Sequence, residues 1–130
     1  MTIQPLALAL ILLAQDTNDP IVQFGFESQG QTYNYIITEG MLDKSPAWTN
    51  SDNPPLSLKS AEAIAQKYAA KEWPSQKLKV MTISLIWAKL VDRWYYEIIM
   101  ESPDPMEGPG STYEVVILMD GTIVEPVKSK

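Results

Sequence analysis

Carboxylates are the side chains best placed to do chemistry in this sequence, because it contains no His and no Cys. The lack of His removes the commonest general base and transition-metal ligand, and with it any His-dependent serine triad or zinc site. Glu97 and Glu101 share one face of a predicted strand, which separates them by roughly 13 Å, beyond the spacing of paired glycosidase carboxylates. We interpret them, together with Glu114 and Asp120 on a neighbouring strand, as a solvated sheet face.

Motifs for metal or phosphate binding are equally weak. Asp104 and Glu107 lie in a loop rich in Pro and Gly, but Ca²⁺ takes about six to eight oxygen ligands. No Gly-Lys-Ser/Thr sequence of a phosphate-binding loop occurs, and Gly108-Pro109-Gly110 opens no predicted helix. We therefore predict no catalytic residues, no metal site and no cofactor.

Composition indicates one acidic globular domain. Ten basic and sixteen acidic residues give a formal net charge of −6, and 45% of the 130 residues are hydrophobic. Nucleic-acid binding requires a basic surface, whereas the densest group of Lys residues is scattered over 67–79. We exclude a nucleic acid as the partner.

The N-terminal segment indicates export. Residues 6–14 are all Leu, Ala or Ile, a run too short for a bilayer span of about 20 residues but typical of a secretory signal peptide. We predict a signal peptide over 1–14, a linker over 15–20, and a secreted or periplasmic protein with no stable membrane span after cleavage. The alternative is that residues 6–14 form a buried strand or helix of the fold.

Period-two alternation of apolar residues predicts two strands, 22–27 and 32–38, with Gly30 in a tight turn between them. Residues 39–55 hold several Pro, Asn and Asp residues, and we expect an irregular loop. Trp48 lies in this loop, where it either packs the loop onto the core or serves as an exposed anchor for a partner.

One helix is predicted from an N-cap at Ser57 to Trp73, because the following Pro74 disfavours helical backbone at the residue before it. Its apolar residues recur at the spacing of one buried helical face: Ala61, Ile64, Ala65, Tyr68 and Ala69. Their small size allows the helix to lie close to a sheet.

Three further strands are predicted over 78–90, 94–101 and 113–119. Asp120-Gly121 predicts a hairpin turn, followed by a brief return strand and a polar tail. The predicted fold class is α+β, with one main helix packed on an antiparallel β-sheet of about four to five strands and an N-terminal β-hairpin. Residues 21–130 form a single domain in this prediction.

The predicted sheet has apolar residues on both faces. If the helix covers one face, the other needs a cover, either the N-terminal hairpin with Phe24 and Phe26 or a partner, which includes a second copy of the chain. The candidate partner-binding residues are Trp48, Tyr95, Ile99, Val116 and Leu118.

Residues 56–125 resemble the PepSY domain family. The resemblance rests on LSLKSAEAIAQKYA for the helix, RWYYEIIM for a central strand and TYEVVILMDGTIVE for the closing hairpin. It implies an exported bacterial protein with a helix on an antiparallel sheet, no catalytic residues, and a role in binding or inhibiting a protein partner such as a peptidase.

The predicted function is therefore an exported, non-catalytic binding or inhibitory module that acts on a protein partner in the cell envelope or outside the cell. The alternative is a small-ligand carrier with an apolar pocket between helix and sheet. Tyr33, Tyr35, Tyr68 and Trp87 are the candidates to line such a pocket.

Overall fold

The computed structural model describes residues 19–103 and 112–129. The elements, in chain order, are β1 (Pro20–Ser28), β2 (Gln31–Thr38), α2 (Glu39–Asp43), α3 (Leu58–Glu72), β3 (Lys79–Ala88), β4 (Arg93–Glu101), β5 (Thr112–Leu118), β6 (Ile123–Val124) and β7 (Val127–Ser129). The predicted signal peptide over 1–14 and the loop residues Asp104 and Glu107 lie outside the described residues. Pro20 already belongs to β1, so this strand begins inside the segment predicted as a linker.

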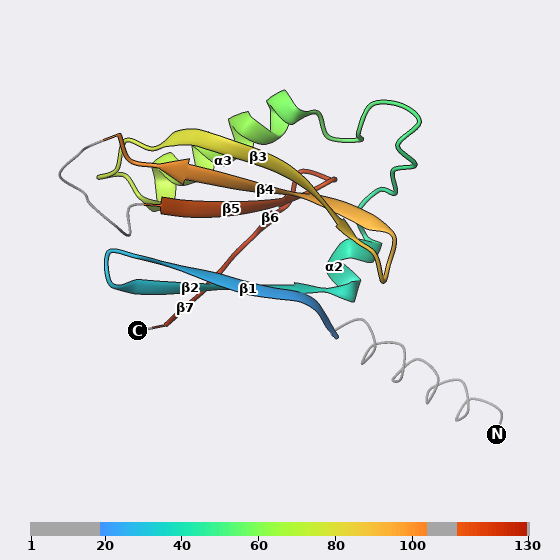
Figure 1. Cartoon of the computed structure of the whole chain (residues 1–130), viewed down its shortest axis with the longest axis horizontal. Helices are drawn as coiled ribbons and strands as arrows, with labels where there is room; N and C mark the ends of the chain where they lie inside the picture. Colours follow the sequence, from blue (N-terminus) through green and yellow to red (C-terminus); the bar gives the residue numbers. More distant parts are fainter. Residues whose placement is uncertain (1–18, 104–111, 130) are drawn as a thin grey trace, which may run out of the picture.

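The strands form two antiparallel sheets, one with the order β1-β2-β7 and one with the order β3-β4-β5-β6. Figure 1 shows the two sheets facing each other, with α3 on the outer side of the four-stranded sheet. The predicted α+β class is confirmed. The predicted antiparallel sheet of about four to five strands is confirmed in part: β3 to β6 form a four-stranded sheet, and the N-terminal hairpin forms a second sheet with β7.

Alternation along β4 explains why the four-stranded sheet is covered on both sides. Tyr96 and Ile98 are fully buried and pack in one cluster with Ala61 and Ala65 of α3. Tyr95, the residue between Trp94 and Tyr96, packs instead in a second cluster that contains the hairpin side chains. The hairpin is therefore the cover of the second face, as one of the two alternatives predicted.

The N-terminal hairpin has the predicted turn. Gln29 and Gly30 connect β1 to β2 with φ values of 56° and 77°, the left-handed backbone that a two-residue hairpin turn requires. Phe24 pairs with Tyr35 and Phe26 with Tyr33 across the strands. This places the aromatic side chains of both strands on the face that meets the other sheet.

Helix α3 begins and ends where its local signals predict. The Ser57 Oγ accepts a hydrogen bond from the Ser60 N–H (3.1 Å), which satisfies one free amide of the first turn. At the other end, the Trp73 N–H donates to the Ala69 carbonyl (2.8 Å), and Pro74 follows. The alanines of its buried face allow close approach to the sheet.

Two short elements differ from the prediction. The segment expected to be irregular from residue 39 starts with helix α2, whose Thr38 N-cap accepts from the Met41 N–H (3.3 Å) and whose Leu42 is fully buried. The expected polar tail contains β7, in which Val127 pairs with Asn34 of β2. Both were missed because they contain three to five residues, too few to carry a periodic pattern.

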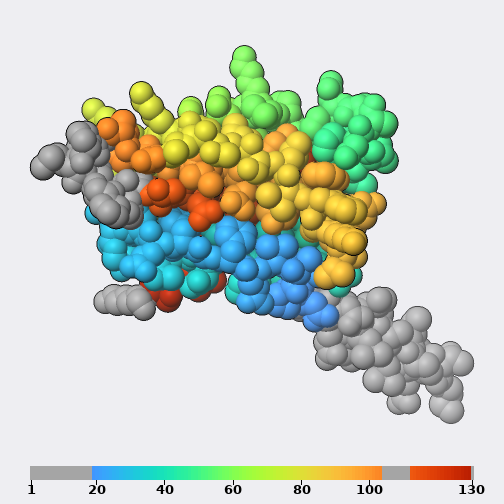
Figure 2. Space-filling view, viewed as in Figure 1, coloured from blue at the N-terminus to red at the C-terminus, as the bar shows by residue number. Residues whose placement is uncertain are grey.

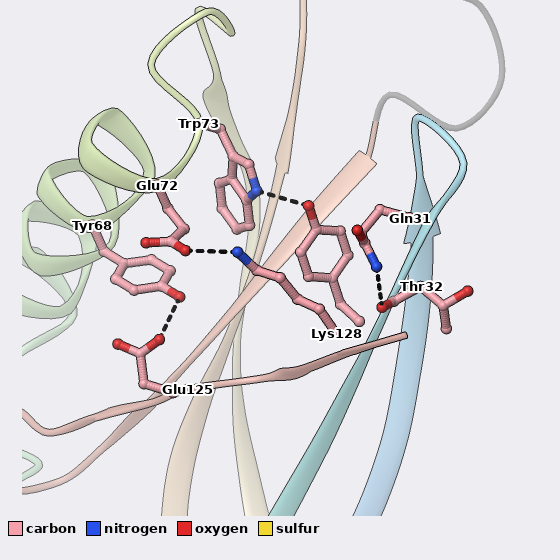
Figure 3. Close-up of polar contacts among 8 residues, drawn as sticks. Gln31, Thr32, Tyr68, Glu72, Trp73, Glu125 and Lys128 are labelled. Carbon is pink, nitrogen blue, oxygen red and sulfur yellow. Dashed lines mark hydrogen bonds and ion pairs between the residues drawn. The ribbon is translucent and has the colours of Figure 1, made fainter. Parts of the chain in front are cut away.

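Polar contacts tie the C-terminal segment to α3 (Figure 3). The Lys128 Nζ lies 3.1 Å from the Glu72 Oε1, and the Tyr68 hydroxyl donates to the Glu125 Oε2 (3.2 Å). The ion pair is partly exposed, so its contribution to stability is modest. These contacts fix the path by which the chain returns from one sheet to the other.

None of the helices in the described ranges is long and apolar enough to cross a membrane.

Candidate partner-binding surface

Three of the four tryptophans gather at one end of the molecule, where they form a cluster that we call the tryptophan corner: Trp48, Trp87 and Trp94. The Trp48 ring lies edge-on to that of Trp94, with centroids 5.2 Å apart at 72°. The Trp87 and Trp94 rings are nearly parallel, with centroids 6.1 Å apart at 22°. In Figure 2 the loop that follows α2, in green, lies beside the tip of the β3–β4 hairpin, in gold.

The β3–β4 turn positions two of these rings. Trp87 and Trp94 are directly paired across the two strands. The turn closes through a hydrogen bond from the Val91 N–H to the Ala88 carbonyl (3.2 Å), and Asp92 adopts a left-handed φ of 52°. The Trp87 Nε1–H donates to the Asp92 Oδ1 (3.0 Å), which fixes the exposed indole against the turn.

The loop after α2 carries the third ring and is attached to the hairpin. The Trp48 Nε1–H donates to the Asp52 carbonyl (2.9 Å), a bond within the loop. The Arg93 Nε–H donates to the Ser45 carbonyl (3.1 Å), a bond between the hairpin and the loop. The relative position of the loop and the hairpin is therefore defined by a hydrogen bond as well as by the contact between the Trp48 and Trp94 rings.

The three rings border an open hollow of about 450 Å³. This volume lies within the range of roughly 300–1,000 Å³ that is usual for ligand pockets. Thr49, Asn50 and Asp92 complete the lining, and the Trp87 side chain keeps 47% of its surface exposed. The hollow can accommodate an extended side chain against large aromatic surfaces, with hydroxyl, amide and carboxylate groups at its border.

The structure distributes the five predicted partner-binding residues over two regions. Trp48 is half-buried in the tryptophan corner, where its indole contacts Trp94. Tyr95, Val116 and Leu118 are buried between the two sheets, with 3%, 0% and 2% of their surfaces exposed. Ile99 lies on the same sheet face and is half-buried. Trp48 is therefore the one of the five that lines the hollow.

Sequence reasoning did not assign Trp87 and Trp94 to a binding surface. Trp87 is predicted as a candidate to line an internal pocket, and Trp94 is predicted only as the first residue of the strand over 94–101. The predicted strands over 78–90 and 94–101 would place Leu90 opposite Trp94, whereas the actual register of β3 and β4 pairs Trp94 with Trp87. The position of Trp48 beside them had no local signal.

The internal pocket of the alternative function has no counterpart among the side chains predicted for it. Tyr33, Tyr35 and Tyr68 are buried in the core, whereas Trp87 lies at the surface. A second hollow, of about 560 Å³, lies between α2 and the turn at Asp120, and not between α3 and the sheet. Within residues 19–103 and 112–129, no group of three or more acidic side chains is close enough to hold a metal ion.

A pair of carboxyl groups lies away from the tryptophan corner. Glu114 is opposite Ile99 in the β4–β5 register and therefore diagonal to Glu97. Partial burial, together with the charge and the hydrogen bond of Glu97, raises the pKa of Glu114 from 4.5 to about 7. Glu114 is half-buried, so the predicted solvated sheet face does not extend to it. The Tyr35 hydroxyl donates a hydrogen bond to the backbone carbonyl of Glu114.

We expect Glu114→Gln to remove a pH dependence of stability. Because the pKa of Glu114 is raised in the folded state, its stabilising contribution is complete below its ordinary value of 4.5 and is lost as the pH rises through about 7. The wild type should therefore lose on the order of 1 kcal/mol between about pH 5 and pH 8, since solvent screens this half-exposed group. Urea denaturation at both pH values measures the change.

Glu27→Gln is the matched control, because Glu27 is exposed on the face of the hairpin that points away from the four-stranded sheet. This variant should keep the wild-type pH dependence. If Glu114→Gln lost as much stability as the wild type between the two pH values, Glu114 would not be the source of the pH dependence.

No family model, no curated protein and no solved structure matches this chain.

Proposed function

We propose that this protein is an exported, non-catalytic binding module that binds a protein partner through the tryptophan corner. The observation that carries the proposal is the gathering of Trp48, Trp87 and Trp94 around one open hollow. Tryptophan is the residue type most enriched among the side chains that dominate protein–protein affinity. The hollow with these three rings is the described surface best suited to that role.

The tryptophan corner is organised before any partner arrives. The indole N–H groups of Trp48 and Trp87 are each held by a hydrogen bond, and the Trp94 ring contacts both of the other rings. Rigid aromatic groups lose little conformational entropy on binding, so more of the contact energy appears as affinity. Leu90, which lies in the β3–β4 turn, is 82% exposed.

The absence of His and Cys from the sequence supports a binding role over a catalytic one. The Glu97 and Glu114 carboxyl groups lie on the sheet face toward the hairpin, and neither lines the hollow at the tryptophan corner. The paired carboxyl groups and the three tryptophan rings therefore belong to two separate sites.

The apolar segment over 6–14 supports export, and the resemblance of residues 56–125 to the PepSY domain family supports a location in the cell envelope or outside the cell. The same resemblance makes a peptidase the first partner to test. Both statements are part of the proposal and rest on the sequence alone.

The proposal is tested by placing a photo-crosslinking amino acid at Thr49, beside the hollow, in the full chain expressed in its native host. Gln66, which is exposed on α3, provides the matched control position. We expect one discrete crosslinked protein from Thr49 and none from Gln66. Trp87→Ala should abolish the product, because it removes the most exposed ring of the hollow.

A product that forms equally from both positions, or that survives Trp87→Ala, would overturn the proposal. A crosslink to a second copy of the chain would identify the partner as itself. The intact mass in each cell fraction tests export separately. Loss of residues 1–14 outside the cytoplasm supports export, and a full-length cytoplasmic product contradicts it.

A further inference from the structure

The lining of the tryptophan hollow is negative in character. Asp92 is its single ionisable residue, and the three indole rings present faces that carry partial negative charge. No Lys or Arg side chain contributes to the lining, and the whole chain has a net charge of −6. A positively charged group is therefore the ligand that the local electrostatics favour.

The Asp92 carboxylate is not neutralised by a neighbour. Its Oδ1 accepts the hydrogen bond from the Trp87 Nε1–H, and it makes no ion pair with any of residues 19–103 and 112–129. Arg93 is adjacent in sequence, but its N–H groups donate to the backbone carbonyls of Ser45, Val91 and Asp92. The Asp92 side chain thus keeps lone pairs available for a donor from outside.

The ring geometry suits a cation. Trp87 and Trp94 are nearly parallel, and Trp48 stands across them at 72° to Trp94, so the hollow has aromatic walls in two orientations. A guanidinium or ammonium group within about 6 Å of a tryptophan ring is attracted by it, and tryptophan is the strongest of the aromatic residues in this respect. An uncharged apolar group would instead remove water from the carboxylate without supplying a compensating charge, which costs free energy.

We propose that the tryptophan hollow binds a cationic side chain of the partner, with arginine preferred. The planar guanidinium of arginine can lie on an indole face while its N–H groups reach the Asp92 carboxylate. This inference rests on the proposed function and specifies its ligand chemistry. It makes Asp92 the residue that selects for charge and the three tryptophans the residues that supply contact area.

The test uses the four indole N–H signals of the isotope-labelled full chain in NMR spectra. N-acetyl-arginine amide is titrated at constant ionic strength, because salt screens exposed charges. We expect saturable shifts of the signals of Trp48, Trp87 and Trp94. The signal of Trp73, which is 7% exposed in the core, should not move and serves as an internal reference.

Two comparisons isolate the charge. N-acetyl-citrulline amide, a neutral analogue of the same shape, should bind at least about five-fold more weakly, the ratio expected when a cation–π contact of roughly 1 kcal/mol is lost. Asp92→Asn should weaken the arginine probe by a similar factor and leave the citrulline probe unchanged. Asp43→Asn, which removes an exposed charge outside the hollow, should leave both unchanged.

Equal affinity for the two probes, or equal weakening by Asp43→Asn and Asp92→Asn, would overturn the cationic ligand. The same holds if no probe moves the three indole signals. In each case the Thr49 crosslink decides the proposed function independently. A crosslinked partner that depends on Trp87 would leave the binding module standing with a different ligand chemistry.

Discussion

Val116→Asp is expected to lower the free energy of unfolding by more than about 4 kcal/mol, a large fraction of the roughly 5–15 kcal/mol that stabilises an ordinary domain. Val116 is fully buried between the two sheets, in a cluster with Tyr35 and Leu118. A carboxylate at this position would have no hydrogen-bond partner and no access to water, and burial of an unpaired charge is among the most destabilising changes. Urea denaturation followed by far-ultraviolet circular dichroism measures the loss.

The matched control for this change is Ile36→Asp. Ile36 lies on the outer face of β2 with 39% of its surface exposed, so a charge there remains hydrated and should cost less than about 1 kcal/mol. The two variants also show whether Tyr95, Val116 and Leu118 belong to the core under the hairpin or to an open partner-binding surface. If this face were open to a partner in the free protein, Val116→Asp would be tolerated as well as Ile36→Asp.

Trp73→Ala is expected to cost about 3–5 kcal/mol, the range for truncation of a large buried aromatic side chain. The Trp73 ring lies at the junction of helix and sheets, with its centroid 5.8 Å from that of Tyr68 and 4.6 Å from that of Tyr113. Its Nε1–H also donates to the Tyr33 hydroxyl (3.1 Å), a buried bond between the helix cap and β2. Chemical denaturation gives the difference directly.

Trp87→Ala serves as the comparison, since it removes a side chain of the same type from the surface. It should change the free energy of unfolding by less than about 1 kcal/mol. Tyr33→Phe separates hydrogen bonding from packing, because it leaves the Trp73 N–H without an acceptor and should cost about 1–3 kcal/mol. Equal losses for Trp73→Ala and Trp87→Ala would contradict the assignment of Trp73 to the core.

The carboxyl pair illustrates how strand pairing creates sites that spacing along the chain conceals. Glu97 and Glu101 attracted attention because they share a strand face, yet they are roughly 13 Å apart. Burial raises the pKa of Glu114 most, and the charged neighbour that raises it further is Glu97 of the adjacent strand. That proximity depends on the register of β4 and β5, which the spacing of residues along one strand does not specify.

The tryptophan corner is a similar case. The β3–β4 hairpin pairs Trp87 with Trp94, whereas the strand ends predicted from the sequence would have placed Leu90 opposite Trp94. Trp48 reaches them from a loop about forty residues earlier in the chain, held by the bond from Arg93 to the Ser45 carbonyl. No local pattern in the loop indicates which part of the surface it will cover.

The sequence by itself determined the elements whose signals are local. The cap at Ser57, the stop at Pro74 and the Gly30 turn act within a few residues, so helix α3 and the N-terminal hairpin were predicted correctly. It also determined that the sheet is apolar on both faces and so requires two covers.

Only the tertiary structure decided what those covers are and which side chains remain outside. The pairing of β7 with β2, the second sheet and the site formed by three tryptophans all join residues far apart in the chain. Such contacts are selected by the total burial of the folded chain, because each segment alone gains too little to order itself. For that reason Val116 became core, whereas Trp87 became surface.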